Sequence, residues 1–281
     1  MTDKPFFPSS LRPGKMLSHG VATFESPVLY FRDDAFALFY TADKHAVEAL
    51  MPTRRLHPVC LPGNRALLGV VVFNYLDTSI GPYGEVGVIV PVVHGQKPPP
   101  LLLPALMEGR YPGFGSLVIH LPVTDQTARD AGRGEWGYPK FVADMRFTIT
   151  PEAMTCDLSE GGRDILTLHV VRQGFLLRDK NPLITYSVRN RNLIETVIPS
   201  KASFRMAINP KGSFLKLGDH TVAQGLAGLG LARKPLLSRY YLERNAILPQ
   251  GRVIEENVRP LDGYVGEDGD GLCETIYFTG A

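Results

Sequence analysis

Lys140 lies in a stretch, "GRGEWGYPKF" (residues 132–141), whose residue types could support a reactive amine. A neutral lysine amine can attack a carbonyl carbon and form an imine, and apolar surroundings disfavour the charged ammonium form. Trp136, Tyr138 and Phe141 are candidates for such surroundings, and Pro139 stiffens the backbone next to the lysine. The same pattern also fits a surface lysine whose stem packs on aromatic rings.

Glu85 is the second residue that could do chemistry, in the stretch "YGEVGVIVPVV" (83–93). The pattern predicts a turn at Glu85, between Gly84 and Gly87, followed by a very apolar strand. A carboxylate in this position is either a solvated turn residue or, if buried, an acid that can transfer protons.

The composition excludes several other classes of protein. The formal net charge is +2, from 30 Lys and Arg against 28 Asp and Glu, which argues against nucleic acid as a partner. The three cysteines stand far apart and the histidines show no paired spacing, so neither a metal site nor a disulfide framework is expected. The apolar runs are far shorter than the ~20 residues of a membrane helix, and the N-terminal residues do not resemble a signal peptide. We therefore expect a cytoplasmic protein that does not act on membranes.

The elements that must position these residues are mainly short strands. Segments rich in Val, Ile, Phe, Tyr and Leu end at Gly, Pro or Asp and predict strands; they are 35–40, 66–75, 87–93, 116–121, 141–149, 165–171 and 204–208. Helices are predicted at 43–52, 103–110 and 124–133, with a weaker one at 221–231. Many short strands separated by turns favour an antiparallel sheet that is closed or sandwiched.

No linker divides the chain, so we expect a single domain over residues 1–281, with a core from about 25 to 255. The acidic, glycine-rich stretch 260–272 is expected to be mobile.

The two chemical stretches together resemble the acetoacetate decarboxylase superfamily. Its lysine pattern, G-R-E-x-x-(G/A)-(Y/F)-P-K, is similar to "GRGEWGYPK", which has one extra residue between Arg133 and Glu135. Its glutamate pattern, Y-x-E-x-G-x-x-x-P, matches "YGEVGVIVP" without a gap. Weaker similarities in "FALFYTADKHAVEALMP", "FLKLGDHTVAQGLAGLGL" and "YYLERNAILPQGRVI" extend the resemblance over about residues 25–255.

The resemblance implies a fold and an assembly. The fold is α+β and mainly antiparallel β, a cone-shaped closed β-barrel with helices packed outside. Members of the family are cytosolic homo-oligomers that need neither a metal nor an organic cofactor. The implied partner is a small-molecule oxo acid.

The resemblance also implies roles for individual residues. Lys140 would form the Schiff base, and Glu85 would transfer a proton or position the substrate. Arg133 and Glu135 are expected to support the loop that carries Lys140. The residues expected to contact substrate are Trp136, Tyr138, Phe141, Arg32 and Tyr241, with Tyr240 as the alternative to Tyr241.

Three departures from the family pattern leave the substrate open. The family's second lysine is replaced by Phe141, and the strand before Glu85 lacks a second glutamate. A family arginine near the first strand aligns with Asp33, and Arg32 is one position away. The implied reaction is a carbon–carbon lyase reaction, the decarboxylation of a 3-oxo acid similar to acetoacetate through an iminium and an enamine. The alternatives are an aldolase or dehydratase that acts on another oxo acid through the same lysine, and a non-catalytic ligand-binding barrel.

Overall fold

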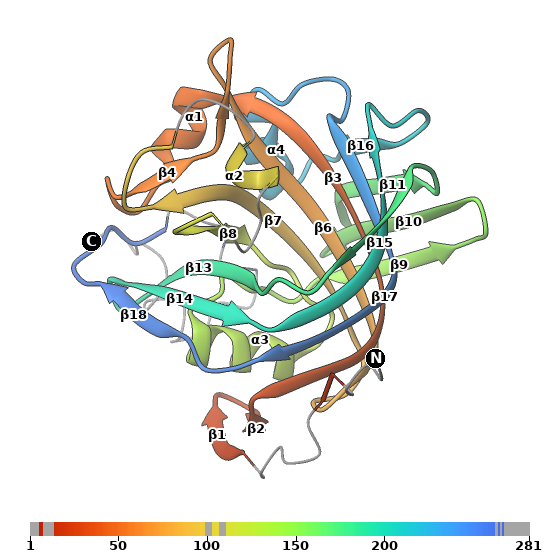
Figure 1. The fold of residues 1–281 in the computed structure, drawn as a ribbon. Helices are drawn as coiled ribbons and strands as arrows, with labels where there is room; N and C mark the ends of the chain where they lie inside the picture. The colour runs from red at the N-terminus through yellow and green to blue at the C-terminus, as the bar shows by residue number, and fades with distance from the viewer. Residues whose placement is uncertain are drawn as a thin grey trace, which may run out of the picture.

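Strands dominate the protein in the computed structural model, which describes residues 6–7, 14–98, 103–106, 111–261, 264 and 266 (Figure 1). The largest unit is a 12-stranded sheet. Its strands are β3 (Val28–Asp43), β4 (Leu56–Pro58), β5 (Cys60–Leu61), β6 (Arg65–Thr78), β7 (Tyr83–His94), β8 (Phe114–His120), β12 (Phe175–Asp179), β13 (Leu183–Arg189), β14 (Asn192–Ile198), β15 (Ser200–Ile208), β17 (Leu237–Leu248) and β18 (Arg252–Glu255).

Two smaller strand units and several short helical segments accompany this sheet. A four-stranded sheet contains β9 (Asp144–Ile149), β10 (Ala153–Glu160), β11 (Arg163–Val171) and β16 (Phe214–Leu217), and a hairpin contains β1 (Lys15–His19) and β2 (Ala22–Ser26). The helical segments are α1 (Lys44–Ala49), α2 (Leu103–Leu106), α3 (Gln126–Ala131), the π-helix η1 (Gly132–Trp136) and α4 (Thr221–Gly228).

The predicted elements correspond to real ones with shifted ends. Every predicted strand overlaps an observed strand, and the helix predicted at 43–52 is α1, whose N-cap Asp43 accepts a hydrogen bond from the Ala46 amide at 2.9 Å. The helices predicted at 124–133 and 221–231 contain α3 and α4, and α2 occupies the start of 103–110, whose residues 107–110 lie outside the described part. The strands outside every predicted strand range are β1, β2, β4, β5, β10, β12, β13, β14, β16, β17 and β18.

The mainly antiparallel α+β architecture is confirmed, but the closed barrel is not. Main-sheet neighbours follow the order β12-β15-β17-β3-β6-β7-β8-β13-β14-β18, and only the β8–β13 pair is parallel. Within the described residues the end strands β12 and β18 do not pair, so no closed ring of hydrogen-bonded strands forms. The single residue Pro199 joins β14, near one end of this path, to β15, near the other. The sheet therefore curls round on itself without closing (Figure 1).

The two faces of β6 and β7 have different roles. Successive side chains of a strand point to opposite faces. One set, including Val70, Val72, Val86 and Val88, packs in a core that also contains residues of the four-stranded sheet and α4. The opposite set lines a cavity. Both faces are covered, which explains why the sequence of these strands is a nearly continuous apolar run.

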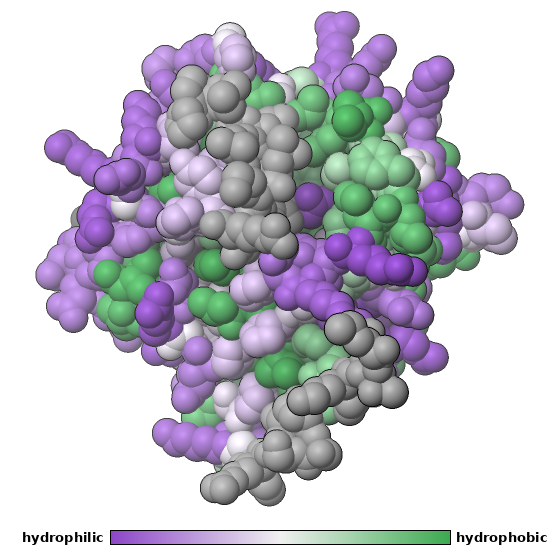
Figure 2. Space-filling view, in the orientation of Figure 1, coloured by the Kyte–Doolittle hydropathy of each residue, from purple (hydrophilic) through white to green (hydrophobic). Residues whose placement is uncertain are grey.

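The surface and the C-terminal residues complete the description. Figure 2 shows hydrophilic side chains around the rim of one face, with hydrophobic side chains in separate areas between them. Most of the range 260–272, predicted to be mobile, lies outside the described residues, but Leu261 is buried in the core. No helix in the described ranges is long and apolar enough to cross a membrane.

Candidate active site

A tight turn places Lys140 at the cavity. The π-helix η1 ends at Trp136 and is capped by Gly137, whose φ of +65° is a left-handed conformation that favours glycine. A Cβ at Gly137 would also lie 2.6 Å from the carbonyl oxygen of Val188. The extended segment that follows is fixed to a neighbouring segment by the amides of Leu121 and Val123, which donate to the carbonyls of residues 139 and 141 at 2.9 Å. The backbone of Lys140 is therefore held on both sides.

Side chains of η1 fix the same segment. The Nε of fully buried Arg133 donates to the Lys140 carbonyl at 2.5 Å. The carboxylate of Glu135 lies 3.1 Å from Nε2 of His19 and accepts from Nε2 of Gln250 at 2.8 Å. These are the contacts expected of loop-supporting residues, and neither Arg133 nor Glu135 is among the residues that line the cavity.

Lys140 and Glu85 form a buried ion pair. Nζ of Lys140 lies 2.7 Å from Oε2 of Glu85, and the two side chains are only 6% and 9% exposed. The predicted turn at Glu85 is wrong, because β7 begins at Tyr83 and Glu85 pairs with Phe73 of β6 inside the sheet. A pair of this kind is costly to bury unless its hydrogen bonds are good, and removal of one partner leaves an uncompensated charge.

Tyrosines surround this pair. The hydroxyl of Tyr75 donates to Oε1 of Glu85 at 3.2 Å, and the ring of Tyr83 lies 5.5 Å from Nζ of Lys140. The hydroxyls of Tyr30 and Tyr83 are 3.1 Å apart. Burial raises the pKa of Tyr75 and of Tyr83 well above the usual value, and burial raises the pKa of Tyr138 to about 12. At neutral pH these phenols are therefore uncharged hydrogen-bond donors.

An arginine from β17 also reaches the cavity. Nη2 and Nε of Arg244 lie 2.8 Å and 3.0 Å from Oδ2 of Asp33, and the guanidinium is 4.6 Å from the Phe73 ring centroid. Burial raises the pKa of Asp33, and the Arg244 guanidinium opposes that shift. Asp33, at the position aligned with a family arginine, therefore holds an arginine supplied by another strand.

Strand irregularities decide which of these side chains face the cavity. In β3 the register with β6 shifts on both sides of Arg32, which is exposed and does not line the cavity. The prediction that Arg32 contacts substrate is therefore not supported by its position. A shift in the β15–β17 register lies between Tyr241 and Glu243, and it turns Arg244 rather than Glu243 toward the cavity.

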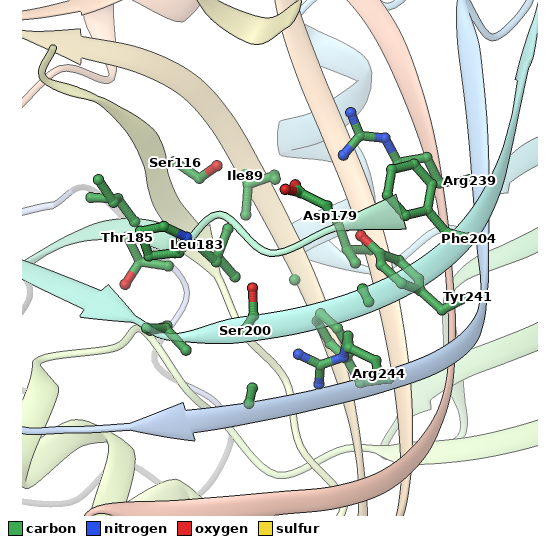
Figure 3. A pocket seen from close by; sticks show the side chains of 18 of the residues that line it. Ile89, Ser116, Asp179, Leu183, Thr185, Ser200, Phe204, Arg239, Tyr241 and Arg244 are labelled. Atoms are coloured by element: carbon green, nitrogen blue, oxygen red, sulfur yellow. The ribbon is translucent and has the colours of Figure 1, made fainter. Parts of the chain in front are cut away.

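The cavity has a volume of about 400 Å³ and walls from many strands. Figure 3 shows Ile89, Ser116, Thr185, Phe204, Tyr241 and Arg244 among the lining side chains. At the end of the cavity with Lys140 and Glu85 the lining residues are Tyr30, Phe73, Tyr75, Glu85, Gly87, Leu121, Tyr138, Lys140, Thr185, Ile198, Arg244, Ala246 and Leu248. The described residues include no group of three or more His, Cys, Asp or Glu side chains that could hold a metal ion.

The predicted aromatic contacts divide into two groups. Tyr138 and Tyr241 line the cavity, whereas Tyr240, Trp136 and Phe141 do not. Trp136 points toward Phe24, at 5.8 Å, and its Nε1 donates to the Pro249 carbonyl. Phe141 follows Lys140 in an extended segment, so its side chain points away from the cavity into the core. The aromatic surroundings of Lys140 therefore come mainly from other strands.

Sequence reasoning missed Tyr75, Tyr83 and Arg244. Tyr83 stands two positions before Glu85, so an extended strand through both would have placed them on one face. Tyr75 pairs directly with Tyr83 across a hairpin. No such signal existed for Arg244, because the register shift between β15 and β17 decides which way its side chain points.

This arrangement can carry out amine chemistry on a carbonyl compound. The carboxylate of Glu85 is close enough to accept a proton from Lys140, which leaves a neutral amine at the wall of a largely apolar cavity. The Tyr75 hydroxyl holds the other carboxylate oxygen, and Arg244 adds a cation in the same wall.

The chain matches a known protein family over most of its length. The model of the family described as acetoacetate decarboxylase (ADC) matches residues 18–256. No curated protein sequence matches the chain.

Several solved structures share the fold at low sequence identity. The acetoacetate decarboxylase from Legionella pneumophila subsp. pneumophila str. Philadelphia 1 has a TM-score of 0.62 at 17% identity, over 88% of this chain and 94% of that one. An acetoacetate decarboxylase-like enzyme from Sphingomonas wittichii RW1 has a TM-score of 0.59 at 12% identity, over 83% and 94%. The enduracididine biosynthesis enzyme MppR, complexed with the condensation product of pyruvate and imidazole 4-carboxaldehyde, has a TM-score of 0.59 at 12% identity, over 88% and 98%.

Proposed function

Because this chain belongs to the acetoacetate decarboxylase family, we propose that it is a lyase that forms a Schiff base between Lys140 and an oxo acid and decarboxylates a 3-oxo acid. The observation that carries this proposal is the buried pair of Lys140 and Glu85, 2.7 Å apart, at a cavity of about 400 Å³. A lysine that served only for stability would have no need of a cavity at its amine.

The reaction begins with transfer of a proton from the Lys140 ammonium to Glu85. The neutral amine adds to the oxo carbon, and the resulting carbinolamine loses water to give an iminium ion. The bond between the carboxylate and the α-carbon then breaks, carbon dioxide leaves, and the electron pair moves toward the iminium nitrogen to form an enamine. Protonation of the enamine carbon and hydrolysis of the iminium release the ketone and restore the amine.

Glu85 is the group placed to move these protons. Its Oε2 is in hydrogen-bond contact with the amine, and its Oε1 is held by the Tyr75 hydroxyl. A carboxylate in this geometry can take the proton from Lys140 and return it to the carbinolamine hydroxyl or to the enamine carbon. The neighbouring tyrosines remain protonated, so they position Glu85 and do not compete as bases.

Arg244 is our candidate for binding the substrate carboxylate, in place of Arg32. Asp33 contacts its Nε and Nη2 through one oxygen, and a guanidinium carries five N–H donors, which leaves donors for a second acceptor. A charge-assisted hydrogen bond contributes about 1.5–3 kcal/mol. We therefore expect Arg244→Gln in an Asp33→Asn background to raise KM for an oxo acid by about 10-fold or more. Borohydride trapping of a neutral methyl ketone should change little. If trapping of the ketone and of the oxo acid fell equally, Arg244 would have no role in binding the substrate carboxylate.

Aldol chemistry through the same lysine is the second candidate. The fold is shared with MppR, which was complexed with a condensation product of pyruvate and an aldehyde. An enamine on Lys140 could attack an aldehyde carbon instead of taking up a proton, and the cavity continues beyond the catalytic pair. Supplying an aldehyde with the oxo acid and measuring the condensed product separates the two reactions.

Reductive trapping tests the proposal as a whole. Incubation with acetoacetate and borohydride should add the mass of the reduced substrate to the peptide that contains Lys140, since borohydride fixes only an imine. Lys140→Arg should show no adduct, because a guanidinium stays protonated in proteins. An adduct on another lysine, or full activity in Lys140→Ala, would overturn the proposal, and binding without any adduct would favour the non-catalytic alternative. The homo-oligomer and the cytoplasmic location implied by the resemblance remain predictions.

A further inference from the structure

The cavity extends far beyond the Lys140–Glu85 pair along an apolar wall. On β7 the residues that face it are Glu85, Gly87, Ile89 and Pro91. At about 3.3 Å per residue, this wall runs about 20 Å from the carboxylate to the proline. A substrate no larger than acetoacetate would occupy only the first part of that length.

The neighbouring strands continue the same apolar character. Val71 pairs with Gly87 and Gly69 pairs with Ile89 across the β6–β7 ladder, and Phe39 pairs with Gly69 on the other side. The outer lining residues without charge are Phe39, Leu67, Val71, Ile89, Pro91, Ala105, Phe114, Ser116, Val118, Leu177, Asn181, Pro182, Leu183, Ile184, Ser200, Ala202, Phe204, Met206, Leu237 and Tyr241. Most of these side chains are aliphatic or aromatic.

A glycine keeps the passage open beside the catalytic pair. A Cβ at Gly87 would meet a Leu121 methyl carbon at 3.3 Å and otherwise only atoms at 3.8 Å or beyond. A larger side chain at this position would project into the space between Glu85 and Ile89. The full cavity, about 400 Å³, lies within the ~300–1,000 Å³ typical of sites for drug-sized ligands.

Three charged residues lie in the outer part, and one of them, Arg239, packs on two rings of the wall. The Arg239 guanidinium lies 5.4 Å and 5.1 Å from the ring centroids of Phe39 and Phe204. Asp179 and the exposed Arg178 come from β12. Figure 3 shows Arg239, Asp179 and Phe204 together at one side of the cavity. Long cationic side chains of this kind cover apolar surface with their stems.

We propose that the substrate is an oxo acid with a long apolar chain, whose oxo group reaches Lys140 while the chain lies along Gly87, Val71 and Ile89. This inference rests on the proposed function and specifies its substrate class. Burying one methylene contributes about 0.8 kcal/mol, which corresponds to about a fourfold gain in kcat/KM for each methylene that the wall covers.

A series of straight-chain 3-oxo acids, from acetoacetate to 3-oxododecanoate, tests the proposal. Two readouts are measured, carbon dioxide release and the rate of inactivation by borohydride at subsaturating acid, because the second does not depend on which reaction follows the imine. Both should rise with chain length until the cavity is filled. 3-Oxoadipate, which carries a second carboxylate at the far end of its chain, should react no better than acetoacetate.

A substitution in the cavity wall tests whether the outer cavity causes the dependence on chain length. Val71→Phe should fill the space opposite Gly87 and lower the ratio of kcat/KM for 3-oxodecanoate over acetoacetate by at least 10-fold. The same exchange at Val253, a 50% exposed valine on β18, should leave that ratio unchanged, and thermal melts check that both variants fold. Imine formation with no dependence on chain length, a preference for 3-oxoadipate, or an unchanged ratio in Val71→Phe would overturn the proposal and leave the Schiff-base function standing. The absence of an imine with every acid would instead refute the proposed function itself.

Discussion

Gly132→Ala should displace the Lys140 side chain without straining the backbone. A Cβ at Gly132 would lie 2.5 Å from Cδ, 2.6 Å from Cε and 3.2 Å from Nζ of Lys140. Ordinary contact begins at 3.4 Å, so the lysine side chain must move by 3.4 − 2.5 = 0.9 Å. Gly132 has helical angles, φ −65° and ψ −44°, which alanine adopts readily and even prefers by up to about 1 kcal/mol.

A misplacement of about 1 Å can reduce an enzymatic rate by about 10²-fold. We therefore expect kcat/KM of Gly132→Ala to fall by about that factor, equivalent to about 2.7 kcal/mol in the activation free energy. The assay combines steady-state rates with the rate of borohydride trapping at Lys140, and thermal melts check that the variant is folded at the assay temperature.

Gly225→Ala is the matched control. Gly225 lies inside α4, and apart from its chain neighbours and the helix backbone no atom lies within 4 Å of the position that the new methyl group would take, so this variant should keep full activity. Wild-type rates and wild-type trapping in Gly132→Ala would refute the reasoning, because they would mean that the position of the Lys140 amine is not critical.

Three further predictions concern the acid, the loop and the response to pH. Glu85→Gln should lower kcat by on the order of 10²-fold or more, since proton transfer is lost; an unchanged kcat in a folded variant would restrict Glu85 to a structural role. Gly137→Ala should lower the free energy of unfolding by more than about 1 kcal/mol, because φ is +65° and a β13 carbonyl oxygen lies 2.6 Å from the new Cβ. Gly63 has a φ of +81° and open space around it, so Gly63→Ala measures the backbone cost alone. If both variants lost the same free energy of unfolding in urea, the contact with the β13 carbonyl would be unimportant. Burial lowers the pKa of His120 from 6.5 to about 4, so between these values the unfolded chain binds a proton that the folded chain does not. The free energy of unfolding should therefore fall as pH drops through this window, by at most about 3 kcal/mol. Unfolding curves measured at each pH should show that the free energy of unfolding of His120→Gln depends less on pH between these values.

Local sequence was sufficient to locate the candidate nucleophile and acid. The stretch around Lys140 and the stretch around Glu85 resemble family patterns of glycine, proline and aromatic residues, and this resemblance is local, although the turn predicted at Glu85 is a strand. The same local rules predicted α1, because Asp43 caps it through a contact three residues away. They also predicted the central strands, whose apolar runs reflect burial on both faces.

Tertiary structure alone decided which side chains share the cavity. The sequence predicted that Trp136 and Phe141 would surround the lysine, but the turn at Gly137 and the alternation of the extended segment direct both away from it. Tyr75 and Tyr83 reach the site instead, because the β6–β7 register sets them opposite each other beside Glu85.

The arginine shows most clearly where local information ends. A one-residue change in strand register turns every following side chain to the opposite face. The irregularities in β3 turn Arg32 outward, and the irregularity in β17 turns Arg244 inward to meet Asp33. Such irregularities depend on how strands about 40 residues apart in the chain pair, and the Arg244–Asp33 contact joins residues 211 apart. The sequence therefore determined which charged residues exist, and only the packed sheet determined which of them face the cavity.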